Sequence, residues 1–319
     1  MTQSIAATDL FKHILVAVDS EGLAAHAAIL GFQLADRLSS KLDLIHAVEI
    51  PPALWPGIDA HELAEMHAAA LAAARKRTLA ALEPELGEAG VGERLGELLS
   101  VWPGRPAKVI RERIEELRSD LLILGPHASP SLFDFGSTAR AILSRVATPI
   151  WIQEPPVSPV RSILVAVDFS QNSRQAVQYA HVLARRLGAS LRMLHCYEPP
   201  GFAYGNRDAS AGPTYVVEEE RSAVQAELER WCTSSEWSSP PIASRFVEGA
   251  PVKTILSEAE PDDLIVMGTH GRGGLARFLV GSVAYGVLKQ SRKPVLVIPI
   301  PARGWLGGHA SGQAAHAHP

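Results

Sequence analysis

The stretch HILVAVDS, from His13 to Ser20, returns as SILVAVDF from Ser162 to Phe169. Each copy contains a short apolar run that ends on an aspartate, Asp19 in the first and Asp168 in the second. Runs that are apolar at successive positions are typical of strands covered on both faces, as in a parallel sheet with helices on either side. The repeated stretch therefore predicts two copies of one α/β unit.

Other segments repeat in the same order along the chain. GRPAKVI, which begins at Gly104, returns as GAPVKTI at Gly249, and SDLLILG, which ends at Gly125, returns as DDLIVMG, which ends at Gly268. A period of about 145 residues is far too long for a solenoid repeat and is typical of a duplicated domain.

The two expected domains meet in EPPVSPV, from Glu154 to Val160, whose prolines suit a short, stiff linker and end the preceding strand. We expect the first domain at residues 10–155 and the second at residues 160–301. Residues 302–319 are rich in glycine and show no periodicity, so we expect a disordered tail.

Each domain alternates short apolar runs with longer amphipathic segments, which predicts a doubly wound, five-stranded parallel sheet of the Rossmann-like class. In the second half we expect strands at residues 163–167, 191–197, 242–247, 264–267 and 295–298, and helices at residues 173–187, 216–231, 252–260 and 282–290. The first half repeats this order, with strands near residues 14, 44, 98, 121 and 150 and a long Ala-rich helix at residues 63–82.

The composition disfavours several classes of protein. The 319 residues include 30 Lys and Arg against 34 Asp and Glu, and a net charge of -4 offers no field that attracts nucleic acid. No stretch approaches the roughly 18 apolar residues of a membrane span, and no signal-peptide pattern is present, so we expect a cytoplasmic protein. The two cysteines, Cys196 and Cys232, are too few for a disulfide framework or a structural zinc site.

The segment MGTHGRGGLARFLVGSV, from Met267 to Val283, is the strongest candidate for a binding site. It follows the fourth expected strand of the second half and leads into a helix. Backbone N–H groups that glycines leave accessible, together with the positive end of the helix dipole, favour a phosphate group here. The spacing matches neither the Walker A loop nor the dinucleotide fingerprint. We expect Ser282 to cap the helix and to donate its hydroxyl to a phosphate oxygen.

The order Gly, two residues, Gly, nine residues and Gly-Ser in this segment resembles that of ATP-binding members of the universal stress protein family, in their tandem, UspE-like form. Three other features agree with that family: Asp168 after the first strand, the pair Leu194 and His195 at the end of the second, and Lys-Pro-Val before the fifth. The resemblance covers both halves of the chain.

The resemblance implies ATP, with magnesium carried by its phosphates, as the ligand of the second domain. In the family the aspartate lies near adenine and ribose, the residue after the Leu-His pair offers backbone hydrogen bonds to adenine, and the glycine loop holds the phosphates. Carried over to this sequence, these roles fall on Asp168, Cys196, Gly268, Gly271, Gly281, Ser282 and Val283. Arg272 and His270 are further candidates for phosphate contacts, although His270 is equally suited to packing the loop.

The first half departs from this pattern. In GPHASPSLFDFGST, which begins at Gly125, Ala128 replaces the second glycine. Pro126 removes a backbone donor, Pro130 stiffens the loop, and Asp134 adds a negative charge near the expected phosphates. We therefore expect weak or no ATP binding in the first domain, which leaves room for another small ligand.

Simpler interpretations of these residues stay open. The second glycine segment could be a tight connection that binds nothing, Asp168 could cap the following helix, and Cys196 could be a small core residue. HELAEMH, from His61 to His67, is not the HExxH signature, and we do not expect it to bind a metal.

The resemblance implies a stress-response protein in which ATP occupancy changes a conformation or a surface for an unknown protein partner. The sequence shows no nucleophile beside a base and no Walker-type lysine, so we expect no dedicated catalysis, while slow ATP hydrolysis stays open. The alternatives are a module for a non-nucleotide ligand, a structural dimer, and an adenylyl-transferring enzyme, although DFSQNS at residues 168–173 lacks the loop motifs of that class.

Family members commonly dimerise through their fifth strands, which are apolar here at residues 150–152 and 295–298. The resemblance therefore implies an intramolecular pseudo-dimer through these strands, and it leaves a homodimer of whole chains open.

Overall fold

The computed structural model of the chain describes residues 10–20, 24–50, 59–126, 137–199, 214–237, 239–270 and 280–300. The expected tail, most of the altered loop of the first half, and Gly271 and Arg272 of the second loop lie outside these residues. No helix among those described is long and apolar enough to cross a membrane.

Each half alternates strands and helices as the sequence predicts. The elements of the first half are β1 (His13–Ala17), α1 (Ala24–Leu38), β2 (Lys41–Val48), α2 (Ala60–Glu88), a 3-10 turn (Gly92–Arg94), α3 (Leu95–Leu98), β3 (Leu99–Pro103), α4 (Pro106–Leu117), β4 (Leu121–Leu124), α5 (Ser137–Leu143) and β5 (Ile150–Ile152). Those of the second half are β6 (Ser162–Val167), α6 (Gln171–Leu187), β7 (Ser190–Tyr197), α7 (Thr214–Cys232), a 3-10 turn (Ser235–Trp237), β8 (Ile242–Glu248), α8 (Pro251–Glu258), β9 (Asp263–Gly268), α9 (Ser282–Gln290) and β10 (Val295–Ile298).

The main difference from the expected elements lies in α2, which is longer than the predicted 63–82 at both ends. Its start is fixed by Asp59, whose carboxylate accepts hydrogen bonds from the backbone N–H groups of His61 and Glu62, each at 2.8 Å. An aspartate in this N-cap position stabilises the first turn of a helix.

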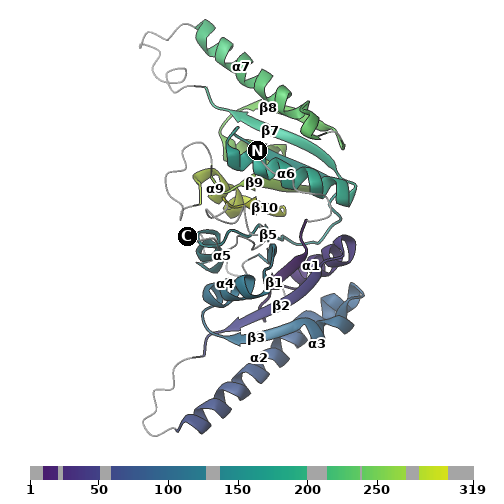
Figure 1. The fold of residues 1–319 in the computed structure, drawn as a ribbon, viewed down its shortest axis with the longest axis vertical. Helices are drawn as coiled ribbons and strands as arrows, with labels where there is room; N and C mark the ends of the chain where they lie inside the picture. Colours follow the sequence, from purple (N-terminus) through teal and green to yellow (C-terminus); the bar gives the residue numbers. More distant parts are fainter. Residues whose placement is uncertain are drawn as a thin grey trace, which may run out of the picture.

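The ten strands form one continuous sheet in the order β3-β2-β1-β4-β5-β10-β9-β6-β7-β8 (Figure 1). Every neighbouring pair is parallel except β5 and β10, which pair antiparallel with Trp151 opposite Leu296. The expected α/β class, with two doubly wound halves joined through their fifth strands, is therefore confirmed.

Helices cover both faces of this sheet. One apolar cluster lies on the face of α1, α2, α6 and α7, and a second lies on the face of α4, α5, α8 and α9. Successive strand residues enter opposite clusters: in β6, Ile163 and Val165 enter the first and Leu164 the second. This arrangement explains why the strands read as continuous apolar runs.

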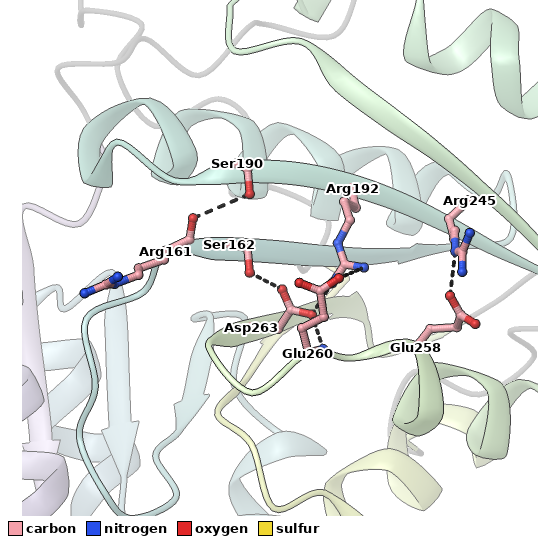
Figure 2. Close-up of polar contacts among 8 residues, drawn as sticks. All are labelled: Arg161, Ser162, Ser190, Arg192, Arg245, Glu258, Glu260 and Asp263. Carbon is pink, nitrogen blue, oxygen red and sulfur yellow. Dashed lines mark hydrogen bonds and ion pairs between the residues drawn. The ribbon is translucent and has the colours of Figure 1, made fainter.

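Polar side chains tie the amino ends of the second-half strands together (Figure 2). The carboxylate of Asp263, which is fully buried, accepts hydrogen bonds from the Ser162 hydroxyl, from the Arg192 guanidinium and, at 2.6 Å, from the backbone N–H of Glu260. Arg192 also pairs with the Glu260 carboxylate at 2.8 Å. Because both oxygens of the buried carboxylate have donors, this rim of the sheet is a structural anchor.

The first half anchors the amino ends of its own strands with different side chains. Asp120 accepts hydrogen bonds from the backbone N–H groups of Lys12 and His13 at 2.8 and 2.9 Å, and the His13 ring pairs with Asp43 at 2.6 Å. Burial raises the pKa of Asp120, an effect that these two backbone hydrogen bonds oppose. In both halves the amino ends are thus occupied by internal contacts, which leaves the carboxyl ends for binding.

Candidate functional site

The carboxyl ends of β6 and β9 lie at the point where the strand order of the second half reverses. From β6 the chain passes to β7 and β8 on one side, and then returns to β9 and β10 on the other. In open α/β sheets the crevice beside such a reversal is the usual place of a ligand. Asp168 follows β6 and Gly268 ends β9, so two of the predicted site residues lie at this reversal.

Asp168 braces the turn between β6 and α6. Its carboxylate accepts a hydrogen bond from the backbone N–H of Ser170 at 3.1 Å. The helix cap is Ser170, whose hydroxyl accepts from the backbone N–H of Ser173 at 3.1 Å, so the capping role considered for Asp168 belongs to Ser170. Between them, Phe169 takes the left-handed conformation with φ of 62°.

The Leu-His pair at the end of β7 joins neighbouring strands. The His195 ring donates from Nδ1 to the carbonyl oxygen of Val167 at 2.8 Å and stacks on Phe169 with ring centroids 4.5 Å apart. In the first half His46 contacts Val18 in the same way at 2.9 Å. The histidine is therefore a structural clamp in both halves.

Cys196 lies on the other face of the sheet from the His195 ring. Its side chain packs against the cluster of α8 and α9, and its thiol approaches the carbonyl oxygen of Pro251 at 3.9 Å. Burial, with smaller contributions from Glu258 and Glu198, raises the pKa of this thiol to about 12. Cys196 therefore has the surroundings of an inert core residue, and only its backbone is a candidate for ligand contacts.

The start of the glycine segment is held by Asn172, a residue that the sequence did not single out. Its amide oxygen accepts from the backbone N–H of His270 at 3.0 Å, and its amide nitrogen donates to the carbonyl oxygen of Ile298 at 3.1 Å. A Cβ atom at Gly268 would lie 2.5 Å from this amide oxygen. Close approach of the Asn172 side chain, and not a special φ angle, therefore requires glycine at 268.

The two ends of the glycine segment are hydrogen-bonded to each other. The backbone N–H of Gly281 donates to the carbonyl oxygen of Thr269 at 2.7 Å, and a Cβ atom at Gly281 would meet that oxygen at 2.9 Å. Thr269 in turn donates its backbone N–H to Ile298 at 3.0 Å. The end of β9 and the start of α9 are therefore held together by the hydrogen bond between Gly281 and Thr269. We call this contact the neck of the glycine segment.

The expected helix cap at Ser282 is wrong. Gly281 occupies the N-cap position of α9, and no side-chain hydrogen bond caps the helix, because Ser282 is already the first helical residue. The Ser282 side chain is exposed, whereas Val283 is half-buried and packs against the second apolar cluster. These two residues lie in the first turn of α9, beside the neck.

His270 follows the neck directly. Its Nδ1 pairs with the Thr269 hydroxyl at 2.9 Å, and its buried Nε2 has no hydrogen-bond partner among the described residues. Both predicted roles, packing and phosphate contact, remain compatible with this position.

Asn172 illustrates what the sequence could have signalled. It stands in DFSQNS. When the two halves are aligned on the preceding strand, Asn172 corresponds to Leu23 of the first half. A polar residue that is buried in the first turn of a helix, where its counterpart is apolar, suggests a hydrogen-bonding role. Thr269, also buried, lies inside the predicted segment but was not distinguished from its neighbours.

Comparisons with known proteins agree with this architecture. A model of the universal stress protein family matches residues 10–153 and 159–299. A universal stress protein of Mycobacterium tuberculosis is 26% identical over 302 residues, which cover 89% of this chain and 96% of that protein. A universal stress protein of Mycolicibacterium smegmatis is 28% identical over 169 residues, which are 51% of this chain and 55% of the relative, about half its length.

Among solved structures, a universal stress protein from Archaeoglobus fulgidus superposes with a TM-score of 0.58 at 18% identity. The match covers 90% of this chain and 98% of the other. At this identity the likeness supports the fold.

Proposed function

Because the chain belongs to the universal stress protein family, we propose that it is a cytoplasmic regulatory protein that binds one ATP per chain, in its second half. The observation that carries this proposal is the neck of the glycine segment, where Gly281 donates to Thr269 at 2.7 Å. Glycine at 268 and 281 lets the backbone close at this point, directly before the positive end of α9. A closed, glycine-rich connection at a helix start suits the phosphates of a nucleotide.

We place the adenine and ribose on the β6 side of the same rim. The ladder between β6 and β7 ends at the pair Val167 and His195, so β7 extends past β6 at Cys196. A base can approach the strand backbone there, and the carboxylate of Asp168 stands one residue past the end of β6 to accept hydrogen bonds from ribose hydroxyls.

Magnesium is proposed to arrive with the nucleotide. In the part of the chain that the structure describes, no group of three or more His, Cys, Asp or Glu side chains is placed to hold a metal ion. Magnesium in nucleotide sites is commonly bound through the phosphates and water, with few protein ligands.

We propose that ATP acts as a regulatory ligand without dedicated chemistry. The thiol nearest to the proposed base, that of Cys196, has a pKa of about 12 and is protonated at neutral pH, so it is a poor nucleophile. The sequence offers no Walker-type lysine to neutralise a leaving phosphate. ATP occupancy would then present a changed surface to a protein partner.

The test is calorimetric titration of the purified chain with ATP and magnesium, beside two matched variants. Gly271→Asp places a carboxylate against the phosphates of the second half, and Ala128→Asp makes the same change at the corresponding position of the first half. We expect saturable binding at one site per chain, lost in Gly271→Asp and retained in Ala128→Asp.

If the wild-type chain gives no binding heat and no thermal stabilisation at millimolar ATP, the nucleotide proposal fails. Loss of binding in Ala128→Asp, with Gly271→Asp unaffected, would instead assign the site to the first half.

A further inference from the structure

The first half of α2 projects beyond the sheet, past β3 (Figure 1). This helix has 29 residues, and its buried side chains, Ala74, Thr78, Leu82 and Leu86, all lie in its second half. Residues 60–73 include no buried side chain. At 1.5 Å per residue they form a helical arm of about 20 Å.

The second half has a similar but shorter projection: α7 also reaches past its edge strand, β8 (Figure 1), and its residues 217–227 include no buried side chain. This helix has 19 residues. Its exposed face carries the consecutive acids Glu218, Glu219 and Glu220 instead of alanines. The Ala-rich arm is therefore a property of the first half alone.

One face of the arm combines small residues with opposite charges at its two ends. We call this face the outer stripe; its exposed residues, spaced by four and three positions, are Glu62, Met66, Ala69, Ala73 and Lys76. The Met66 side chain is 53% exposed, which is unusual for a large apolar residue. At about 100° per residue, Ala69 points away from the buried Thr78 by half a turn, so the outer stripe faces away from the body of the chain.

We propose that the outer stripes of two chains pair antiparallel and form a homodimer, with its two-fold axis at Ala69. Glu62 lies seven residues before Ala69, and Lys76 lies seven residues after it. In an antiparallel pair each Glu62 therefore faces the Lys76 of the other chain, and the contact repeats on the far side of the axis. A face that is complementary to itself in this way is what a two-fold dimer requires.

The side chains between these charges favour close contact. Ala69 and Ala73 leave room for the helices to approach to about 8 Å, the short end of the usual 8–10 Å range, and Met66 adapts to the gap beside them. Antiparallel helix dipoles also attract, and the bodies of the two chains lie on opposite, outer sides of the pair.

The expected dimer is weak and sensitive to salt. An arm of this length buries less than the roughly 1,200 Å² of a stable interface, so the monomer and the dimer should exchange. The two Glu62–Lys76 pairs are exposed and are screened as ionic strength rises. The arm and the nucleotide site share no residue, so this proposal stands independently of ATP binding.

The test is sedimentation velocity of the full chain over a range of concentrations at low salt, with charge variants of the arm. Glu62→Lys places like charges opposite each other twice per dimer and should raise the dissociation constant roughly tenfold. The double variant Glu62→Lys with Lys76→Glu should restore dimerisation to within about threefold, because the pairs are rebuilt with reversed signs. Glu88→Lys, an equal change at the far end of α2, is the control and should have no effect.

A cross-link gives an independent measurement. Ala69→Cys places two thiols next to each other at the two-fold axis, so mild oxidation should yield a covalent dimer. Burial raises the pKa of both native thiols, Cys196 to about 12 and Cys232 to about 11, which keeps them out of this reaction.

A wild-type chain that stays monomeric at every concentration would overturn the proposal. So would a dimer in which Glu62→Lys and the double variant behave like the wild type, since another surface would then hold the chains together. Circular dichroism of each variant checks that the exposed substitutions leave α2 folded.

Discussion

The side chain of Asn172 joins three separate segments of the second half. It lies at the start of α6, accepts a hydrogen bond from His270 after β9, and donates one to Ile298 at the end of β10. Gly268 packs against it so closely that a methyl group has no place. The geometry of the proposed phosphate segment thus depends on one buried amide and on the absence of one side chain.

Gly268→Ala should lower the free energy of unfolding by about 1–3 kcal/mol, because the new Cβ atom overlaps the Asn172 amide. In the double variant Gly268→Ala with Asn172→Ala the overlap disappears, so the combined loss should be smaller than the sum of the single losses by about 1 kcal/mol or more. Urea denaturation of the four proteins measures this coupling.

Gly87→Ala provides the control for this cycle. A Cβ atom at Gly87 meets nothing within 4 Å, so alanine there should be neutral or slightly stabilising. Strict additivity of the Gly268 and Asn172 changes would show that the contact between them has no energetic weight.

The two native thiols should react slowly in the folded chain. Burial raises the pKa of Cys196 to about 12 and that of Cys232 to about 11, so the reactive thiolate is scarce at pH 8. Alkylation by iodoacetamide, followed by intact mass, should be over a hundredfold slower in native than in denatured protein, where thiols titrate near pH 8.5. Rapid native modification of either thiol would show that its surroundings open readily.

Among single residues, the sequence singled out Gly268 and Gly281, whose phosphate-binding role stays a prediction, and it missed residues that act through contacts across the fold. Gly268 and Gly281 were recognisable because glycine spacing reports on chain geometry. The contacts of Asn172 are with residues about a hundred positions away, and no local pattern records them. The cap expected at Ser282 is wrong because the helix starts at Ser282 itself and Gly281 is the N-cap. A shift of one residue at a helix start decides whether a side chain is placed to cap the helix.

Among elements, β5 and β10 are short strands that depend on each other. β5 lies between β4 and β10, and β10 lies between β5 and β9, so neither is an edge of the sheet. Trp151 is fully buried at this junction, opposite Leu296. A strand that loses such a neighbour exposes a row of unpaired backbone groups.

The isolated second half, residues 160–301, should therefore associate through β10. Removal of β5 leaves the Val295 to Val297 edge open, and antiparallel pairing of two copies would replace the missing strand. Light scattering after size exclusion should give twice the mass of the fragment. Because the fragment lacks α2, the outer stripe plays no part, and a folded, monomeric fragment would contradict this expectation.

The sequence predicted the elements of the second half to within two residues at each boundary, since apolar runs and amphipathic stretches alternate clearly there. The first half was less regular. The earlier start of α2 depends on the cap at Asp59, and the strand expected near residue 98 starts one residue later, after α3. Local capping and short helical turns shift boundaries in ways that periodicity does not show.

For the whole molecule, the antiparallel junction fixes where the two halves present their carboxyl ends. All strands of the first half run parallel to β5, and all strands of the second half run parallel to β10. The end of β4, from which the altered loop departs, and the end of β9, from which the glycine segment departs, therefore lie at opposite rims of the sheet. No single small ligand can contact both.

This separation allows the two halves of the repeat to differ in sequence independently at their carboxyl ends. Because β4 and β9 end at opposite rims, sequence changes after β4 need no matching change after β9. The sheet is shared by both halves and constrains the sequence of both, whereas the residues at each rim are constrained only by their own half. The site of one half could thus be altered without a compensating change in the corresponding site of the other half.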